Sequence, residues 1–342
     1  MLEAVQLGNS GLRVSELCLA TMNFGIPGRG HQGDWTLTLE EARPIVKAAI
    51  DHGLFYFDCA DIYGLGASEE VVGALLKELL PRDEYVLATK IAMPMGRGAN
   101  QGGLSRKHVR EGIDACLQRT GHDYIDHLVI HRHPHGIPGS ARTPIEETLE
   151  ALHDAVKEGK VLYLGGSSMF AWQFAELQLT AKMNNWTPFV SMQNHHNLVY
   201  REEEREMNPY CASTGVALTP WSPLARGILA GSYQGGFSGG STSRSQGQDR
   251  KRTEGLYQGD HVFPIAERVI ETASKYECSP AQIAVAWLKG RPEVTSPIVG
   301  VSKVSQLEDL VAAAAIELAA EDVAYLEELY QPVENLLSIG TS

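Results

Sequence analysis

Short β-rich runs alternate with amphipathic helical patterns along the whole chain. The runs lie at residues 17–21, 55–59, 86–90, 126–131, 161–166, 189–193, 216–221 and 296–300. Between them, several segments carry apolar residues at the 3.6-residue spacing of a helix, namely 38–53, 68–80, 105–121, 143–160 and 264–276. Strands that alternate with helices pair in parallel through right-handed crossovers. The pattern therefore predicts an α/β fold with eight parallel strands.

Eight such strands fit either a doubly wound open sheet or a closed barrel. Polar residues stand at the C-terminal ends of strands spread along the chain: Asp58, Lys90, His131, Ser167, Gln193 and Trp221. In a (β/α)8 barrel these ends converge on one mouth, where catalytic loops lie. The first run is not followed by the GxGxxG sequence that a Rossmann sheet usually needs. We therefore expect a single (β/α)8 TIM barrel domain over residues 1–342, with extended loops at its C-terminal mouth.

One segment of low complexity interrupts the alternation. Residues 231–255 are rich in glycine and serine and basic at their end. Since the eighth strand lies beyond this segment and is needed to close the barrel, we interpret it as a flexible loop and not as a linker between domains. We expect it to be mobile without a bound cofactor and better ordered with one.

Composition and charge exclude several classes of protein. The net charge of −13 argues against binding to a nucleic-acid backbone, which needs Lys and Arg concentrated on one face. No apolar run approaches the roughly 20 residues that span a bilayer, and the N-terminus lacks the pattern of a secretory signal. Five single cysteines without a CxxC pair do not form a disulfide framework. We expect a cytoplasmic protein whose partner is a small molecule, without nucleic acid or membrane.

Four of the polar side chains suit proton transfer. Asp58, Tyr63, Lys90 and His131 follow three consecutive strands, so they would lie near one another at the mouth. A tyrosine releases its proton only near pH 10. An adjacent ammonium lowers that pKa, and a carboxylate keeps the ammonium charged when it is buried. We expect Asp58 to hold Lys90, Lys90 to lower the pKa of Tyr63, and His131 to donate a hydrogen bond to a carbonyl.

A metal-dependent hydrolase barrel is an alternative interpretation of the same region. His131, His133 and His135 alternate, and His127 lies upstream, so three imidazoles could face one side if the strand continued. Pro134 argues that the strand stops, and later strand ends supply no matching set of ligands. We expect no metal. Taken singly, each polar residue also has a plainer interpretation, and Asp61 is expected to be a turn former.

The stretch FDCADIYGLGASEE (57–70) resembles the FDTAxxYGxGxSE signature of the aldo-keto reductases, which reduce carbonyls with NAD(P)H on a (β/α)8 barrel. The likeness continues in LATKI, DYIDHLVIHRHP, GKVLYLGGSS, MQNHHNLVYREEERE, PWSPLARGILAG and SPIVGVSKVSQLEDL, in the order of the family and over nearly the whole chain. It looks closest to the branch that holds bacterial sugar-type reductases and the β-subunits of potassium channels.

The resemblance implies roles for individual residues. Asp58, Tyr63, Lys90 and His131 match the catalytic tetrad of the family, in which hydride passes from the nicotinamide C4 to the carbonyl carbon while the tyrosine protonates the oxygen. The matching cofactor positions are Thr21 and Met22 by the nicotinamide ribose; Ser167, Ser168 and Gln193 by the carboxamide; Trp221 on the nicotinamide ring; Ser222, Pro223, Leu224 and Arg226 by the pyrophosphate; Arg244 in the covering loop; and Gly300, Ser302, Lys303, Gln306 and Asp309 by the adenosine. Trp35, Met93 and His133 are candidates for substrate contact.

Some positions depart from the family. Ala20 replaces the usual glycine, Ser168 stands where Asn or Arg is common, Leu310 stands where an Asn often contacts adenine, and His196 replaces a frequent tyrosine. His195 and His196 are expected to line the mouth or to pack. The channel subunits suggest a rival function, a barrel that binds the cofactor as a regulatory or scaffold protein. In those subunits the position that matches the histidine of the tetrad often holds another residue. The presence of His131 in this chain therefore favours an enzyme.

The turn after the eighth strand bears on the choice of cofactor. Lys303 and Ser302 offer a cation and a hydroxyl just before a helical pattern, and the 2′-phosphate of NADP needs such donors. We therefore expect NADP(H) to be preferred over NAD(H). The sequence does not indicate the substrate, the physiological direction or the oligomeric state.

Overall fold

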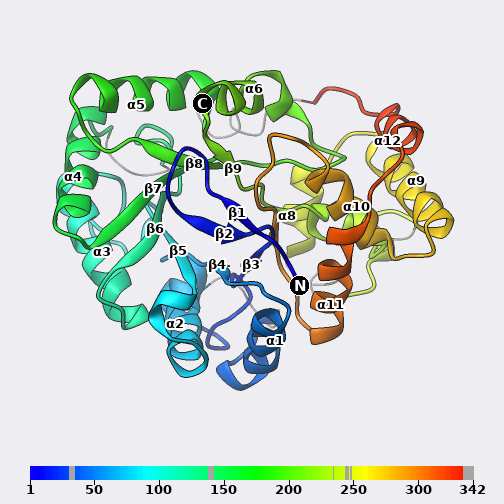
Figure 1. Cartoon of the computed structure of the whole chain (residues 1–342), viewed down its shortest axis with the longest axis horizontal. Coiled ribbons are helices and arrows are strands. Elements are labelled where there is room, and N and C mark those ends of the chain that lie inside the picture. Colours follow the sequence, from blue (N-terminus) through cyan, green and yellow to red (C-terminus); the bar gives the residue numbers. More distant parts are fainter. Residues whose placement is uncertain (31–34, 138–141, 234, 243–245, 247–248, 334–342) are drawn as a thin grey trace.

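Eight parallel strands form the centre of the protein and are surrounded by helices (Figure 1). The computed structural model describes residues 1–30, 35–137, 142–233, 235–242, 246 and 249–333. The strands are β3 (Cys18–Ala20), β4 (Tyr56–Asp58), β5 (Val86–Ile91), β6 (Ile125–Ile130), β7 (Val161–Ser167), β8 (Phe189–Gln193), β9 (Ala217–Leu218) and β10 (Ile298–Val299). Each coincides with one of the predicted runs, so the predicted strands are confirmed.

The sheet curls until its two edges meet. Its order is β10-β3-β4-β5-β6-β7-β8-β9, and all neighbours are parallel. Beyond β9, the bridge between Trp221 and Ile298 and the hydrogen bond from the Ile298 amide to the Pro220 carbonyl (2.9 Å) connect the edge strands. This closure confirms the predicted (β/α)8 barrel and turns all eight C-terminal strand ends toward one mouth.

Helices cover the outside of the sheet. They are α1 (Leu39–Asp51), α2 (Ala67–Leu79), α3 (Arg106–Thr120), α4 (Ile145–Lys157), α5 (Ala171–Met183), α6 (Met207–Thr214), α8 (Asp249–Leu256), α9 (Val262–Lys275), α10 (Pro280–Lys289), α11 (Val304–Ala312) and α12 (Ala320–Glu327). The predicted start of α1 is a capping box: Thr38 accepts from the Glu41 amide, and Glu41 accepts from the Thr38 amide. Helix α8 lies inside the segment predicted as a loop, so residues 231–255 are not loop throughout.

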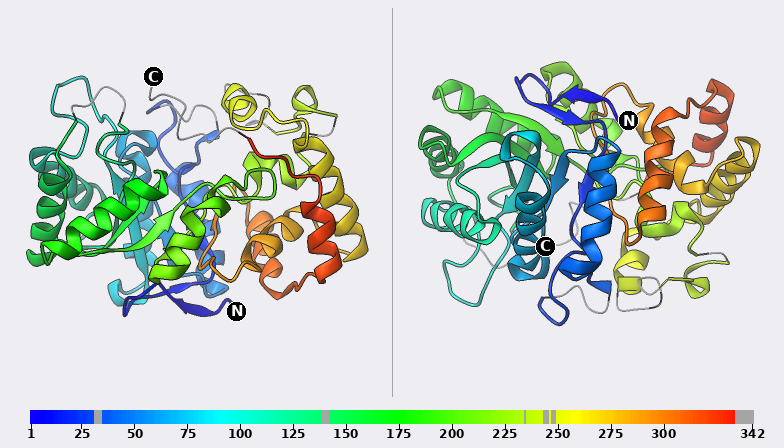
Figure 2. Two further views of the ribbon diagram at one scale, coloured as in Figure 1. Left: turned by 90° about the horizontal axis from the view of Figure 1, so that it is seen from above. Right: turned by 60° about the horizontal axis from the view of Figure 1, so that its bottom comes forward.

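A hairpin that the sequence pattern did not indicate closes the opposite end of the barrel. Strands β1 (Ala4–Gln6) and β2 (Arg13–Ser15) pair in antiparallel fashion below the sheet, on the side away from the long loops (Figure 2). Ser15 accepts hydrogen bonds from the amides of Phe55 and Tyr56, and Leu7 and Val14 pack on the start of the strands. The hairpin therefore plugs the N-terminal end and leaves the mouth as the open side.

A polar layer lies inside the barrel below the mouth. The His127 imidazole contacts the Tyr56 hydroxyl through Nδ1 (2.9 Å) and the Ser191 hydroxyl through Nε2 (2.7 Å). A Cβ atom at Gly165 would overlap this ring, so the chain needs a glycine here for steric reasons. Burial, and then the charge of Lys90, lower the pKa of His127 to about 3, so the ring is neutral.

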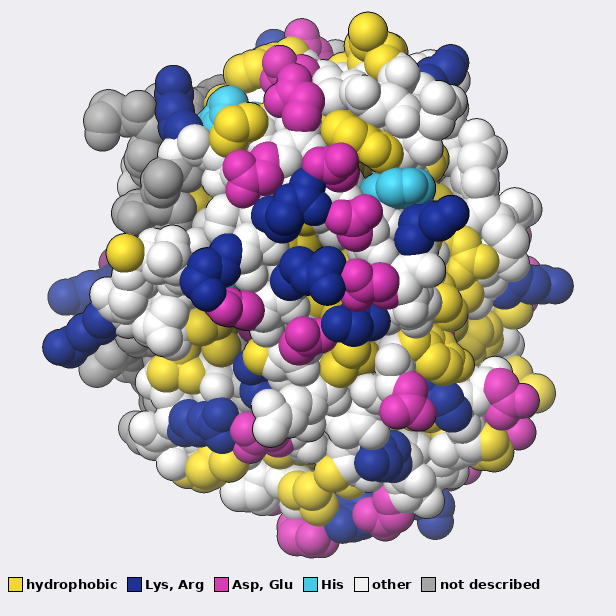
Figure 3. Space-filling model, turned by 90° about the vertical axis from the view of Figure 1, so that its left-hand side faces the viewer, with side chains coloured by type: hydrophobic (Ala, Val, Ile, Leu, Met, Phe, Trp, Pro, Cys, Tyr) yellow, Lys and Arg dark blue, Asp and Glu magenta, His cyan; other side chains and the backbone are white. Residues whose placement is uncertain are grey.

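Acidic and basic side chains are interspersed on the face shown in Figure 3. Helices α3 and α4 lie on this side, and ion pairs join them, including Arg106 with Asp154 and Arg110 with Glu158. A mixture of this kind is not the continuous basic surface that a phosphate backbone requires. None of the helices described is long and apolar enough to pass through a bilayer.

Candidate active site

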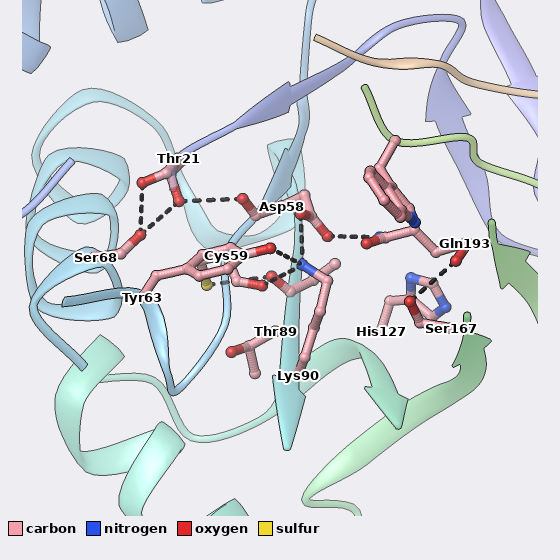
Figure 4. Close-up of polar contacts among 12 residues, drawn as sticks. Thr21, Asp58, Cys59, Tyr63, Ser68, Thr89, Lys90, His127, Ser167 and Gln193 are labelled. Atoms are coloured by element: carbon pink, nitrogen blue, oxygen red, sulfur yellow. Dashed lines mark hydrogen bonds and ion pairs between the residues drawn. The ribbon is translucent and has the colours of Figure 1, made fainter. Parts of the chain in front are cut away.

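The four predicted catalytic side chains come together at the C-terminal strand ends. Asp58 ends β4, Lys90 lies near the end of β5, and His131 follows β6. Tyr63 opens a short helical turn five residues after Asp58. Figure 4 shows the Lys90 ammonium hydrogen-bonded to the Asp58 carboxylate and to the Tyr63 hydroxyl.

The Lys90 ammonium uses all three of its hydrogens inside the protein. It donates to Asp58 Oδ2 at 2.6 Å, to the Cys59 carbonyl at 2.8 Å and to the Tyr63 hydroxyl at 3.4 Å. The side chain is completely buried. Burial is the largest single effect and lowers the pKa of Lys90, but Asp58, Tyr63 and Cys59 together outweigh it and raise the pKa above the ordinary value. Lys90 is therefore a fixed ammonium, as predicted.

The predicted effect on Tyr63 is only partly present. Burial raises the pKa of the Tyr63 phenol, and the charge of Lys90 opposes this rise without cancelling it. The lowering by Lys90 is therefore present, but burial has the larger effect on the pKa of Tyr63. Desolvation of the phenolate exceeds the attraction of an ammonium that is already paired with Asp58.

His131 is held beside Tyr63 as a neutral ring. The two rings meet edge to face, with centroids 5.9 Å apart, and the His131 amide donates to the Ile91 carbonyl at 2.9 Å. Burial, followed by the charges of Arg132 and Lys90, lowers the pKa of His131 well below its ordinary value. A neutral imidazole next to a phenol can donate one hydrogen bond to a carbonyl oxygen but does not serve as the acid.

Gln193 connects the predicted cofactor residues to the tetrad. Its side-chain amide donates to Asp58 Oδ1 at 2.9 Å, while the Ser167 hydroxyl donates to the Gln193 carbonyl at 3.0 Å. One carboxylate oxygen of Asp58 thus accepts a hydrogen bond from Lys90, and the other accepts one from Gln193. The sequence analysis missed this contact.

Trp221 lies at the end of a stack of three rings. His195 is nearly parallel to Trp221, with centroids 4.0 Å apart, and to Tyr200 on its other side, at 4.3 Å. The Trp221 indole N–H donates to the Ser168 hydroxyl at 3.1 Å. His195 therefore packs behind Trp221 and fixes the plane of the indole, which is half-exposed at the mouth. His196 lies elsewhere, fully buried between Glu204 and Trp287.

The loops that follow the strands hold unusual backbone conformations. Several residues other than glycine have positive φ, namely Leu65, Ala92, Ser168, Ser222, Ala225 and Arg226. Such angles cost energy for L-residues and gather at binding sites. Those between Ser222 and Arg226 belong to the segment predicted to lie along a pyrophosphate. Pro223 and Leu224 lie within this bent segment, and the Arg226 side chain forms an ion pair with Asp249 of α8.

The turn after β10 holds the predicted adenosine residues. Ser302 donates to Gln306 through its amide (2.8 Å) and its hydroxyl, which fixes the turn before α11. Lys303 is exposed and forms no ion pair with any residue that the structure describes. Asp309 accepts from the Ser279 hydroxyl at 2.6 Å and so supports α10.

Other predicted cofactor positions divide between mouth and interior. Gly300 lies exposed at the end of β10, and Met22 is half-buried after β3. Thr21 is fully buried, and its hydroxyl contacts the Asp58 carbonyl (3.1 Å) and Ser68 (2.8 Å), so it supports Asp58 from behind. Leu310 is in the core. Arg244 lies outside the described residues.

The histidines near β6 do not converge. The strand ends at Ile130, and His127 is locked in the barrel interior. His133 and His135 meet edge to face at 5.0 Å, and His135 contacts the Thr143 carbonyl. Across the described part of the chain, no three potential ligands are arranged to hold a metal ion. Of the candidates for substrate contact, His133 is buried, while Trp35 and Met93 are half-buried.

Comparison with known proteins gives consistent matches over the whole chain. The profile of the aldo/keto reductase family matches residues 16–331. A putative aryl-alcohol dehydrogenase of Schizosaccharomyces pombe is 44% identical, over 96% of this chain and 95% of the relative. The versiconal hemiacetal acetate reductase of Aspergillus parasiticus is 40% identical, over 97% and 98%. A putative aryl-alcohol dehydrogenase of Saccharomyces cerevisiae is 34% identical, over 97% and 98%.

Proposed function

The chain belongs to the aldo/keto reductase family of oxidoreductases, and we propose that it interconverts an aldehyde or ketone and the corresponding alcohol with NADP(H), using Tyr63 as the proton donor. The observation that carries the proposal is the buried chain of contacts from Asp58 through Lys90 to Tyr63, beside a neutral His131. The names of the relatives, aryl-alcohol dehydrogenase and hemiacetal acetate reductase, agree with chemistry at a carbonyl or an alcohol.

The direction of the hydrogen bonds supports Tyr63 as the proton donor. Because Lys90 donates to the Tyr63 oxygen, the phenol hydrogen is free to point at a carbonyl oxygen in the mouth. When Tyr63 gives up this proton, the ammonium stabilises the phenolate that forms. The neutral His131 orients the carbonyl by a hydrogen bond, and Asp58 keeps Lys90 charged throughout.

The remaining mouth residues fit a nicotinamide cofactor, which supplies or accepts the hydride when it is bound. Trp221 offers a flat, half-exposed ring of fixed orientation, and Ser167, Ser168 and Gln193 lie next to it. The bent backbone after Ser222 and the exposed Lys303 suit phosphate groups. Lys303 is the reason to expect NADP(H) in preference to NAD(H).

A regulatory or scaffold barrel is the second candidate. It would bind the cofactor without turnover, so a complete proton-transfer set would serve no purpose in it. The presence of His131 next to Tyr63 therefore favours the enzyme.

Replacement of Tyr63 by phenylalanine tests the proposal. We expect Tyr63→Phe to lower turnover of a carbonyl substrate about a hundredfold or more, the usual scale of general acid catalysis, and to retain NADPH affinity in a fluorescence titration. Tyr124→Phe, which removes a hydroxyl from a tyrosine packed on Arg82 away from the mouth, is the matched control and should retain activity. Unchanged turnover in Tyr63→Phe would refute the assignment.

A further inference from the structure

Arg132 is a half-buried cation at the mouth whose hydrogen-bonding capacity is mostly unused. It follows His131 directly after β6, and among the described residues its side chain donates one hydrogen bond, from Nη1 to the His131 carbonyl at 2.6 Å. No Asp or Glu within the described ranges forms an ion pair with it. Other partly buried arginines differ: Arg82 is paired with Asp126, and Arg119 with Glu69. A guanidinium has five donor hydrogens.

The guanidinium lies close enough to the reacting groups to act on them electrostatically. Its charge lowers the pKa of Tyr63 and of His131, against the larger effect of burial on Tyr63. Burial lowers the pKa of Arg132 itself, and Arg252 of α8 adds a second positive charge. Arg252, which is exposed, also has no acidic partner among the described side chains. Arg132 and Arg252 are thus two cations near His131 without an acidic partner among the described residues, in a chain with a net charge of −13.

Holding a desolvated cation without a counter-ion is unfavourable unless a ligand supplies the anion. The substrate is a suitable source, since its carbonyl must lie between Tyr63 and His131, next to Arg132. The planar fork of an arginine matches a carboxylate and binds it through two parallel hydrogen bonds.

We propose that Arg132 binds a carboxylate on the substrate, so that the enzyme acts on carbonyl compounds that carry an acidic group, of which the formylbenzoates are examples. The inference rests on the proposed carbonyl reduction and specifies its substrate class. Arg132 is the specificity-determining residue, and Arg252 adds attraction from α8.

A pair of substrates that differ only in charge isolates this contact. The kcat/KM values of 3- and 4-formylbenzoate are compared with those of their methyl esters for the unmodified enzyme, Arg132→Met, Arg132→Lys and Arg252→Met. The acid-to-ester ratio should exceed one in the unmodified enzyme and fall about 10- to 100-fold in Arg132→Met, the scale of a charged hydrogen bond. Lysine should restore part of the ratio, because it keeps the charge but not the fork.

Two further measurements control for other effects. Arg110→Met removes an arginine that pairs with Glu158 on the outer α3–α4 face, so it changes the net charge without changing the mouth and should leave the ratio unchanged. NADPH affinity is measured in every variant, because a fall in the kcat/KM of Arg132→Met that parallels a fall in its NADPH affinity would mean that Arg132 binds the cofactor. Equal losses for acid and ester would show that Arg132 only positions His131. Either result would overturn the proposal.

A binding experiment separates this proposal from the proposed function. Calorimetry measures the affinity of terephthalate, a dicarboxylate that cannot be reduced here, for the NADP⁺-loaded protein. If no formylbenzoate is turned over, the reductase function fails, while terephthalate binding that falls at least tenfold in Arg132→Met still supports the carboxylate site. Terephthalate that binds the unmodified protein and Arg132→Met equally, or binds neither, refutes it.

Discussion

The pair of Asp58 and Lys90 can be tested for its contribution to stability. Its side chains are 3% and 0% exposed, and the carboxylate and ammonium are 2.6 Å apart. Asp58→Asn leaves the ammonium buried with only neutral partners, the Cys59 carbonyl and the Tyr63 hydroxyl. Removing one member of a buried pair costs about 3–5 kcal/mol, because the remaining charge stays desolvated. We expect a loss of that size in the free energy of unfolding.

A double-mutant cycle separates the pair from other effects of the substitutions. Lys90→Met should cost a similar amount, since Asp58 then keeps only its contact with Gln193. The double variant carries no unpaired charge, so it should be more stable than the sum of the single losses predicts, by about 2–3 kcal/mol. Urea unfolding at pH 7 provides the free energies, with the m-value as the check that the variants unfold comparably.

An exposed pair provides the control cycle. Lys107 and Glu111, on one face of α3, are 57% and 58% exposed, and their coupling should be below about 0.5 kcal/mol. A coupling between Asp58 and Lys90 as small as this control value would show that burial does not set the strength of the pair, and would refute the prediction.

Three other predictions concern the cofactor, pH and packing. Lys303→Met should weaken NADPH binding by about 1.5–3 kcal/mol and leave NADH nearly unchanged; fluorescence titrations with both cofactors check this, and equal losses would contradict it. Burial raises the pKa of Glu203 from its ordinary value of about 4.5 to about 8. The contribution of this group to the stability of the folded state is therefore fully present below pH 4.5 and is lost as the pH rises through 8. Glu203→Gln should therefore resist urea better than the unmodified protein at pH 9 and similarly at pH 4.5; a difference independent of pH would refute the linkage. A Cβ at Gly73 would overlap the Thr120 carbonyl oxygen where α2 packs on α3, so Gly73→Ala should lower the stability of the fold by about 1–3 kcal/mol. Gly255→Ala adds a methyl group in open space and should not lower it. Calorimetry compares the two variants, and equal Tm values would contradict the steric argument.

The barrel and the grouping of Asp58, Tyr63, Lys90 and His131 could be predicted because their signals are local. The strands are short, largely apolar runs, and polar residues such as Asp58 and Gln193 end some of them. Thr38 with Glu41 forms a cap within four residues. The hairpin β1–β2 was missed because three-residue strands, partly exposed, show no clear alternation. The helix α8 was missed because its sequence is polar and follows a glycine-rich stretch.

Features that depend on distant segments could not be predicted. The contact of Gln193 with Asp58 joins residues 135 positions apart, so only the closed barrel brings them together. The sign of the pKa change at Tyr63 depends on how fully the phenol is buried, which spacing does not show. The unpaired state of Arg132 likewise follows from the absence of acidic neighbours in the described part of the fold.

The left-handed residues at the mouth affect how the protein would respond to selection. Leu65, Ser168 and Ser222 occupy conformations that glycine adopts at no steric cost. Under selection for heat resistance alone, glycine would relieve strain of about 1 kcal/mol at each position, although glycine also adds freedom to the unfolded chain. Where the relief of strain exceeds the cost in the unfolded chain, lineages selected for stability would accumulate glycines around the mouth. The loops that hold Trp221 and Tyr63 would then lose their fixed shape. Heat resistance and turnover would then be inherited as opposing traits, and the conflict would be confined to the rim of the barrel.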